Sequence, residues 1–343
     1  MTDPIPLLID TDPGVDDALA LLMAFNDPRH RVVGLTIAAG NVGLPHTVAN
    51  ALKLCEVADV DIPVFAGCAA PLLHAAEDAG YVHGRDGFGD IGHPPAARTA
   101  EVEHAVQAIL RLSHEHAGKL LLVALGPLTN LAVALKLDPE LPKRIARVVV
   151  MGGAVTGRGN TSAVAEFNIG FDPEAAHIVF EAFPRIELVD WEAVLEHGFR
   201  HVDVERWMQS GSARATFYET ISRKTRQWAG DCRGDRWHSA DALAMAQALQ
   251  PGGALETAER PLAVELAGHH SRGATVVDWQ RRGGSPDNVA ILLRYDQARF
   301  EGMVEAALAA GVAGGPRFAR VAPGACAGDC RPAILPSFLP HNW

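Results

Sequence analysis

Four aspartates lie within eight positions near the start of the chain, in the segment DTDPGVDD: Asp10, Asp12, Asp16 and Asp17. Carboxylates this close repel one another, so several of them converging need a cation, protonation or open water. Oxygen ligands alone suit a hard divalent ion, Ca²⁺ or Mg²⁺, because zinc normally recruits His or Cys. The structural alternative is that the last two aspartates complement a helix dipole while the first two serve the turn at Pro13 and Gly14. We favour the metal site, because all four together exceed what a helix start and a turn require.

The elements that must position these carboxylates are short apolar runs alternating with helical patterns. Strands are expected at 5–9, 31–38, 62–66, 119–125, 147–151 and 186–189, with helices between them, one of them at about 100–116. This alternation predicts βαβ units and a mainly parallel sheet. Ligands of such open sheets bind beyond the carboxyl ends of the strands, and the aspartates begin where the first strand ends.

We predict one α/β domain over 1–312 with a Rossmann-like open sheet flanked by helices, followed by an irregular C-terminal extension over 313–343. Polar, Gly-rich loop insertions interrupt the strand and helix pattern at about 74–98 and 152–170. Two later apolar runs are expected to be added strands that form a small hairpin; they lie at 273–279 and 288–295.

Composition excludes several partners. Lys+Arg is 30 and Asp+Glu is 41, giving a net charge of −11, the wrong sign for a protein that neutralises nucleic-acid phosphates. The N-terminus lacks a basic segment followed by a long apolar one, so we expect a cytoplasmic protein that does not contact membranes. Five scattered cysteines suit reduced thiols. The Cys326 and Cys330 pair is weak evidence for a metal or a disulfide.

Six further motifs follow the aspartates in order: AAGNVG (38–43), VHGRDGFGD (82–90), ALGPLTNLA (124–132), VVMGGA (149–154), GNTSAVAEFNIGFDPEAA (159–176) and DALAMA (241–246). With DTDPGVDDA (10–18), this set resembles the inosine-uridine-type nucleoside hydrolases over about 5–312. The resemblance implies hydrolysis of the N-glycosidic bond of ribonucleosides to ribose and a free base, with a tightly bound Ca²⁺. It also implies nucleoside salvage by a homo-oligomer, a dimer or a tetramer.

The resemblance assigns the metal ligands and the general base. It implies that Ca²⁺ is held by Asp12, Asp17, Asp241 and the backbone carbonyl of Leu125. Asp12 is also the expected general base for the attacking water. Asp10 is expected to support the loop without contacting the substrate. Such a cleavage passes through an oxocarbenium-like transition state, so the site must also hold the ribose and help the base to leave.

The resemblance also assigns contacts to the sugar and the base. The expected ribose contacts are Asp16, Asn41 and Asn168 at the hydroxyls, Asn160 and Glu166 on the 5′ side, and Met151 as an apolar contact. His83 lies in the Gly-rich insertion, which is expected to act as a lid over the base. Each asparagine alone could equally be a turn residue or a helix cap. The ordered set favours the functional interpretation.

One position departs from the family. Many members carry His, and some Trp, immediately before the last metal aspartate, but here that residue is Ala240. Alanine can neither donate a proton nor stack on a base. We predict His238 as the proton donor and Trp228 as a base contact, with Trp237 as a second aromatic candidate. The structural alternative is that His238 is an ordinary polar residue near a helix start and that both tryptophans are packing residues.

Two other functions stay open from the sequence. The segment DTDPG could begin a phosphatase of the haloacid-dehalogenase type, with an aspartate as nucleophile. That chemistry also needs a lysine and a downstream acidic pair, which do not occur in convincing order. The second alternative is a nucleoside-binding paralogue with weak or no turnover, because Ala240 replaces the usual leaving-group residue.

Overall fold

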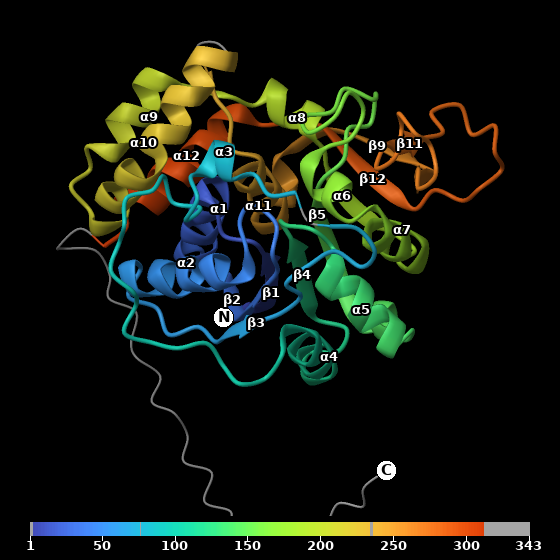
Figure 1. The fold of residues 1–343 in the computed structure, drawn as a ribbon, viewed down its shortest axis with the longest axis horizontal. Coiled ribbons are helices and arrows are strands. Elements are labelled where there is room, and N and C mark those ends of the chain that lie inside the picture. Colours follow the sequence, from blue (N-terminus) through green and yellow to red (C-terminus); the bar gives the residue numbers. More distant parts are fainter. Residues whose placement is uncertain (1–2, 76, 234–235, 312–343) are drawn as a thin grey trace, which may run out of the picture.

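The computed structural model describes residues 3–75, 77–233 and 236–311 (Figure 1). Its centre is an eight-stranded sheet with the order β3-β2-β1-β4-β5-β6-β12-β9. Its strands are β1 Ile5–Thr11, β2 His30–Ile37, β3 Val64–Ala66, β4 Leu120–Ala124, β5 Ile145–Met151, β6 Ile186–Val189, β9 Ala254–Arg260 and β12 Val289–Tyr295. Two small sheets pair β7 Phe199–Arg200 with β8 Arg236–Trp237, and β10 Leu262–Val264 with β11 Thr275–Val277.

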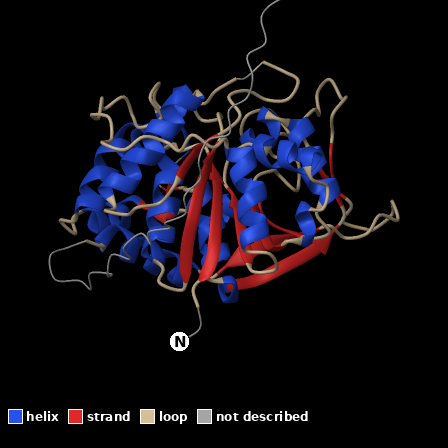
Figure 2. Ribbon diagram, turned by 90° about the horizontal axis from the view of Figure 1, so that it is seen from below, coloured by secondary structure: helices blue, strands red, loops and turns tan. Residues whose placement is uncertain are grey.

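Helices cover both faces of the main sheet (Figures 1 and 2). They are α1 Val15–Asn26, α2 Leu44–Val57, α3 Gly80–His83, α4 Ala105–Glu115, α5 Thr129–Leu137, α6 Phe167–Phe171, α7 Pro173–Ala182, α8 Trp191–Glu196, α9 His201–Met208, α10 Ala213–Arg233, α11 Ala240–Leu249 and α12 Gln297–Ala309. The helix expected at about 100–116 begins only at Ala105, because the His104 ring caps it and accepts a hydrogen bond from the Val106 N–H. In the described part of the chain, no helix is both long enough and apolar enough to cross a bilayer.

The first six strands of the sheet are parallel, and their order, 3-2-1-4-5-6, is that of the Rossmann fold. The predicted mainly parallel sheet is therefore confirmed. The strand order reverses between β1 and β4, which pair directly. This reversal point is where open α/β sheets bind their ligands. The segment with the four aspartates leaves the sheet here.

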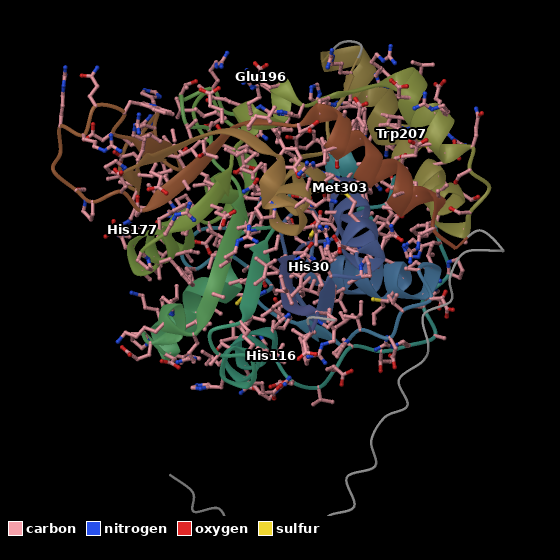
Figure 3. All side chains as sticks on the ribbon, turned by 180° about the vertical axis from the view of Figure 1, so that it is seen from behind. His30, His116, His177, Glu196, Trp207 and Met303 are labelled. Carbon is pink, nitrogen blue, oxygen red and sulfur yellow. The ribbon has the colours of Figure 1, made fainter. Side chains whose placement is uncertain are left out.

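The sheet separates two hydrophobic layers because successive side chains of a strand point to opposite faces. On β1, Leu7 and Ile9 belong to the layer under α1 and α11, whereas Leu8 belongs to the layer under α4 and α5. All three side chains are fully buried. Figure 3 shows the side chains from behind, where Met303 of α12 packs against the first layer. Burial on both faces fixes the position of the end of β1.

The two C-terminal apolar runs do not pair with each other as we expected. The first contains β11, which forms the small added hairpin with β10 instead. The second contains β12, which lies inside the main sheet, parallel to β6 and antiparallel to β9. Its apolar side chains are buried there, as at Val289 and Ile291. The boundary predicted at 312 stays a prediction, because the extension with Cys326 and Cys330 lies outside the described residues.

Candidate active site

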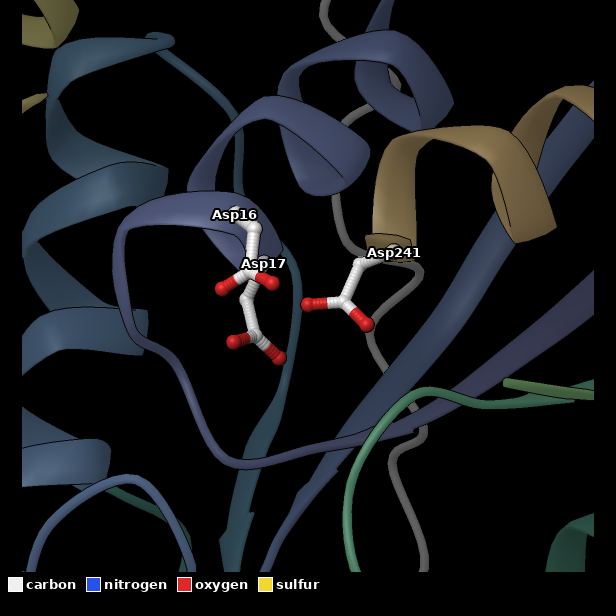
Figure 4. Close-up of side chains that lie close together, drawn as sticks. All are labelled: Asp16, Asp17 and Asp241. Atoms are coloured by element: carbon white, nitrogen blue, oxygen red, sulfur yellow. The ribbon is translucent and has the colours of Figure 1, made fainter. Parts of the chain in front are cut away.

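Three carboxylates from two distant parts of the chain meet beyond the carboxyl end of β1. Asp16 and Asp17 lie in the first turn of α1, and Asp241 lies in the first turn of α11, which packs against α1. Oxygen atoms of the three side chains lie within 4.8 Å of one another (Figure 4). The structure therefore brings Asp241 to the N-terminal acidic segment, as the resemblance implied.

Hydrogen bonds hold Asp17 in place. Its carboxylate accepts from the Thr11 hydroxyl, from the Gly14 N–H over 2.9 Å and from the Asn41 side-chain amide over 2.9 Å. These donors come from the end of β1, the turn before α1 and the loop after β2. Sequence reasoning missed Thr11, although its place between two aspartates at a strand end was the available signal.

Asp12 lies beside this group in a pocket made by two glycines. Its Oδ2 accepts the Asn41 N–H over 2.6 Å. A Cβ atom on Gly40 would lie 2.1 Å from Asp12 Oδ2, and one on Gly126 would lie 2.3 Å from Asp12 Oδ1. Both positions therefore need glycine for the carboxylate to sit here. Asp12 does not belong to the group of three carboxylates within 4.8 Å.

The charges of these acids oppose one another. Burial raises the pKa of Asp12 well above its usual value, and the negative charge of Asp17 raises it further. The pKa of Asp241 is raised in the same way, first by burial and then by Asp16 and Asp17. None of the described residues that line the adjoining cavity is a lysine or an arginine. Buried oxygen donors without such a cation fit a hard divalent metal ion.

Asp10 is separate from this cluster. Its Oδ1 accepts hydrogen bonds from the Thr36 hydroxyl over 2.6 Å and from the Asn130 side-chain amide over 2.9 Å. Its carbonyl accepts the Leu125 N–H over 2.8 Å. Burial raises the pKa of Asp10 to about 6. Asp10 thus connects β1 to β2, to α5 and to the segment after β4, and it is absent from the described cavity lining.

A cavity opens beside the acidic cluster, and most of the residues predicted from the sequence line it. They are Asp16, Asn41, His83, Leu125, Met151, Asn160, Glu166, Asn168, Trp228, His238 and Asp241. Asp12 and Asp17 are buried and do not appear in the lining. Ala240 and Trp237 are further lining residues. The sequence did not indicate the other eight, which include Tyr81, Trp191, Phe167 and Thr225.

Asn168 and Glu166 order one wall of the cavity. The Asn168 side-chain amide donates to the Leu125 carbonyl over 2.6 Å and to the Met151 carbonyl over 3.3 Å. Glu166 caps α6, accepting the Asn168 N–H over 2.9 Å and the Gly153 N–H over 2.8 Å. Burial outweighs these hydrogen bonds and raises the pKa of Glu166 to about 7. In this wall, side chains and backbone are thus joined by hydrogen bonds.

Asn160 belongs to the same wall and approaches it from the preceding loop. Its Oδ1 accepts the Phe167 N–H over 2.8 Å. Its own N–H donates to the Ala165 carbonyl over 3.1 Å. Asn160 therefore shapes the loop that leads into α6, in addition to lining the cavity.

His83 lies on α3, over the start of α1. It is 8% exposed, and its Nδ1 accepts the Val15 N–H over 3.2 Å. The same atom lies 3.8 Å from Asp16 Oδ1. A Cβ atom on Gly14 would lie 2.8 Å from His83 Nδ1, so the close approach requires a glycine. Because Nδ1 accepts, a neutral His83 carries its proton on Nε2.

Two tryptophans and His238 form another part of the lining. Trp228 of α10 contacts Tyr81 edge to face, with ring centroids 6.3 Å apart. His238 follows β8 and packs so closely against Gly198 that a Cβ there would lie 2.5 Å from His238 Nε2. Trp237 is 4% exposed. The lining of the cavity therefore combines acidic with aromatic side chains.

Comparison with known proteins shows the family of this chain. The family model described as inosine-uridine preferring nucleoside hydrolase matches residues 7–302. The chain is 34% identical to an inosine-uridine preferring nucleoside hydrolase of Leishmania major, over 86% of this chain and 95% of that protein. It is also 34% identical to the pyrimidine-specific ribonucleoside hydrolase RihA of Klebsiella pneumoniae, over 89% of this chain and 98% of that protein.

A solved structure shows the same fold. A plant nucleoside hydrolase superposes with a TM-score of 0.84 at 30% identity, covering 90% of this chain and all of that one. The match in sequence and in fold extends over nearly the whole described part of the chain. The chain therefore belongs to the inosine-uridine preferring nucleoside hydrolase family of enzymes, the ribonucleoside N-glycosidases.

Proposed function

We propose that this chain hydrolyses the N-glycosidic bond of ribonucleosides in a calcium-dependent reaction, releasing ribose and a free base. One observation carries the proposal: carboxylates of α1 and α11 converge at the reversal point of the sheet, beside a cavity with asparagine amides and aromatic rings. A cluster of acids at the end of a parallel strand suits a hard cation. Amides suit sugar hydroxyls, because they both donate and accept.

The calcium ligands in this proposal are Asp12, Asp17, Asp241 and the Leu125 carbonyl. The Leu125 oxygen accepts one hydrogen bond, from Asn168, and a carbonyl has a second lone pair for a metal. Burial and, after it, repulsion by neighbouring carboxylates raise the pKa values of Asp12, Asp17 and Asp241. These shifts support the assignment, because a bound cation would offset both effects. Calcium, when bound, would neutralise these charges and acidify the attacking water.

The protein groups then divide the remaining work. Asp12 accepts the proton of the water that attacks the sugar carbon. Asp16, Asn41 and Asn168 hold the ribose hydroxyls. Positive charge develops on the ribose in the transition state, and the acidic side chains of the site stabilise it. Glu166 and Asn160 hold the 5′ side, and Met151 lies against the sugar as an apolar contact.

The leaving base lies against the aromatic side chains of the cavity. His83 contacts the base through Nε2, since its Nδ1 is occupied by the Val15 N–H. Trp228 stacks on the base. His238 donates a proton to the departing base, the role that Ala240 cannot perform. The names of the two relatives described above state different base preferences. The base that this chain prefers must therefore be measured.

The proposal also covers the compartment, the biological role and the oligomeric state of the enzyme. We infer that the protein works in the cytoplasm, in nucleoside salvage, as a homo-oligomer of two or four copies. The free thiols of Cys55 and Cys68 suit a reducing compartment. Sedimentation at several protein concentrations measures the number of copies.

The test is kcat/KM over inosine, guanosine, adenosine, uridine and cytidine, with and without a calcium chelator. We expect turnover of at least one nucleoside, its loss on chelation and its return with Ca²⁺. Asp12→Asn should abolish hydrolysis of p-nitrophenyl riboside, whose leaving group needs no proton. The control is Asp61→Asn, an exposed aspartate in the loop before β3, which should retain full activity. Nucleoside binding without turnover by the unmodified chain would instead identify a binding paralogue.

A further inference from the structure

One face of α10 holds the segment that carries His83. Five residues of α10 contact the segment 81–90, and their spacing of four, three, one and three positions places them on one face of the helix: Phe217, Ile221, Lys224, Thr225 and Trp228. Tyr81 and Val82 meet the last two of these residues, and the end of the segment, Phe88 to Asp90, meets the first three.

The contacts at the outer positions are of three kinds. Trp228 meets Tyr81 edge to face. Lys224 forms an ion pair with Asp90. A Cβ on Gly89 would lie 2.7 Å from the Ile221 carbonyl, and Gly89 has a φ of +74°, so two reasons require glycine there. Both ends of the segment are thus held against α10.

The contact in the middle is a hydrogen bond from a buried hydroxyl. Thr225 is 3% exposed, and its Oγ1 donates to the Val82 carbonyl over 3.0 Å. That carbonyl belongs to the peptide unit that joins Val82 to His83. The N–H of the same unit, on His83, donates to the Ala79 carbonyl over 3.1 Å. Both polar groups of the peptide plane are therefore fixed.

The orientation of this plane determines where the His83 ring points. A peptide unit is planar, so its rotation changes ψ of Val82 and φ of His83 together and swings the side chain. On its other side the ring is held by the Val15 N–H at Nδ1. Without Thr225 the plane would keep only the bond to Ala79 within a single helical turn, and a single turn is weak by itself.

We propose that Thr225 is a positioning residue: its hydroxyl fixes the Val82–His83 peptide and so directs His83 Nε2 at the leaving base. This inference rests on the proposed function, because it takes His83 as a base contact. It predicts that Thr225 matters for natural nucleosides, whose bases leave with difficulty, and not for a riboside with an activated leaving group.

The test compares Thr225→Val, which keeps the shape and removes the hydroxyl, with Thr225→Ser, which keeps the hydroxyl. For the natural nucleoside that the wild type cleaves best, we expect kcat/KM to fall about tenfold in the valine variant and to recover to within about twofold in the serine variant. For p-nitrophenyl riboside, we expect a change of less than about twofold. Thr220→Val is the matched control, since that exposed hydroxyl on the same helix bonds only to the Thr216 carbonyl in the described structure.

A double-mutant cycle separates positioning from direct contact of Thr225 with the base. In a His83→Ala background, assayed at high enzyme concentration, Thr225→Val should change kcat/KM by less than about twofold. An equal loss in both backgrounds would overturn the inference, as would equal losses on the two substrates or no loss at all. Failure of the proposed function looks different, because the wild type would then cleave neither substrate.

Discussion

The side-chain amide of Asn168 donates a hydrogen bond to the backbone carbonyl of Leu125 over 2.6 Å. The bond joins α6 to the segment after β4, across 43 positions of the chain. It connects a proposed ribose contact to a proposed calcium ligand, so that sugar binding and metal binding both depend on this hydrogen bond.

Asn168→Ala should therefore weaken both functions. A group that orients a metal ligand typically accounts for about 10- to 100-fold in affinity or activity. We expect a loss of that size in kcat/KM and a weaker calcium affinity, measured by calorimetry. Asn160→Ala is the comparison, because Asn160 bonds to the Phe167 N–H and not to Leu125. It should lower activity while leaving calcium affinity unchanged. Equal calcium affinity in both variants would contradict a role of the Asn168 hydrogen bond in calcium binding.

Gly40→Ala should inactivate the enzyme through Asp12. The added Cβ would lie 2.1 Å from Asp12 Oδ2, which is less than any real contact, so the carboxylate must move. We expect at least about a hundredfold loss of kcat, because displacing a catalytic group by 1 Å can cost that much. Gly43→Ala is the control on the same loop, since its nearest atom would be 3.9 Å away. Comparable losses in the two variants would indicate a general effect on the loop.

His238→Ala should slow natural nucleosides more than p-nitrophenyl riboside. A proton donor contributes about 10² to 10⁴-fold when the leaving group needs the proton and little when it does not. The measurement is kcat for both substrates in the variant and in the wild type. His114→Ala, an exposed histidine of α4, serves as the control. Equal slowing of both substrates would rule out His238 as the acid.

Glu166 should make stability depend on pH. Burial raises the pKa of Glu166 from 4.5 to about 7, so the folded state binds this proton more tightly than the unfolded state. The tighter binding of this proton contributes to the free energy of unfolding. That contribution is fully present below about pH 4.5 and is lost as the pH rises through about 7. The upper bound is about 3 kcal/mol.

Urea unfolding at several pH values measures this contribution. Between pH 5 and pH 7 the free energy of unfolding should fall less steeply in Glu166→Gln than in the wild type, both assayed without calcium. Glu181→Gln is the control, because that glutamate lies near the exposed end of α7. The same slope in Glu166→Gln and in the wild type would show that Glu166 does not titrate in this range.

The sequence by itself determined the layered architecture and indicated about half of the residues that line the cavity. Alternating apolar runs and helical patterns are local, so they indicated the first six strands of the sheet. The acidic segment and the later motifs supplied nine residues that line the cavity, and the departure at Ala240 led to two more, Trp228 and His238. Local patterns do not determine which strands become neighbours. The strand β12 was therefore assigned to the wrong partner, and the edge strand β9, with its charged and exposed side chains, was not recognised.

Only the tertiary structure decided how distant segments meet. Asp241 joins Asp17 because α11 packs against α1, and no spacing in the chain reports that packing. No pattern in the sequence marked Thr225 or Tyr81, because the role of a hydroxyl or an aromatic ring depends on the residue that it contacts. The glycines at 14, 40 and 126 are similar, because their need for a bare Cα arises from side chains that approach from other segments. The sequence shows periodicity and the chemical types of the residues, whereas packing alone sets the distances between residues of different segments.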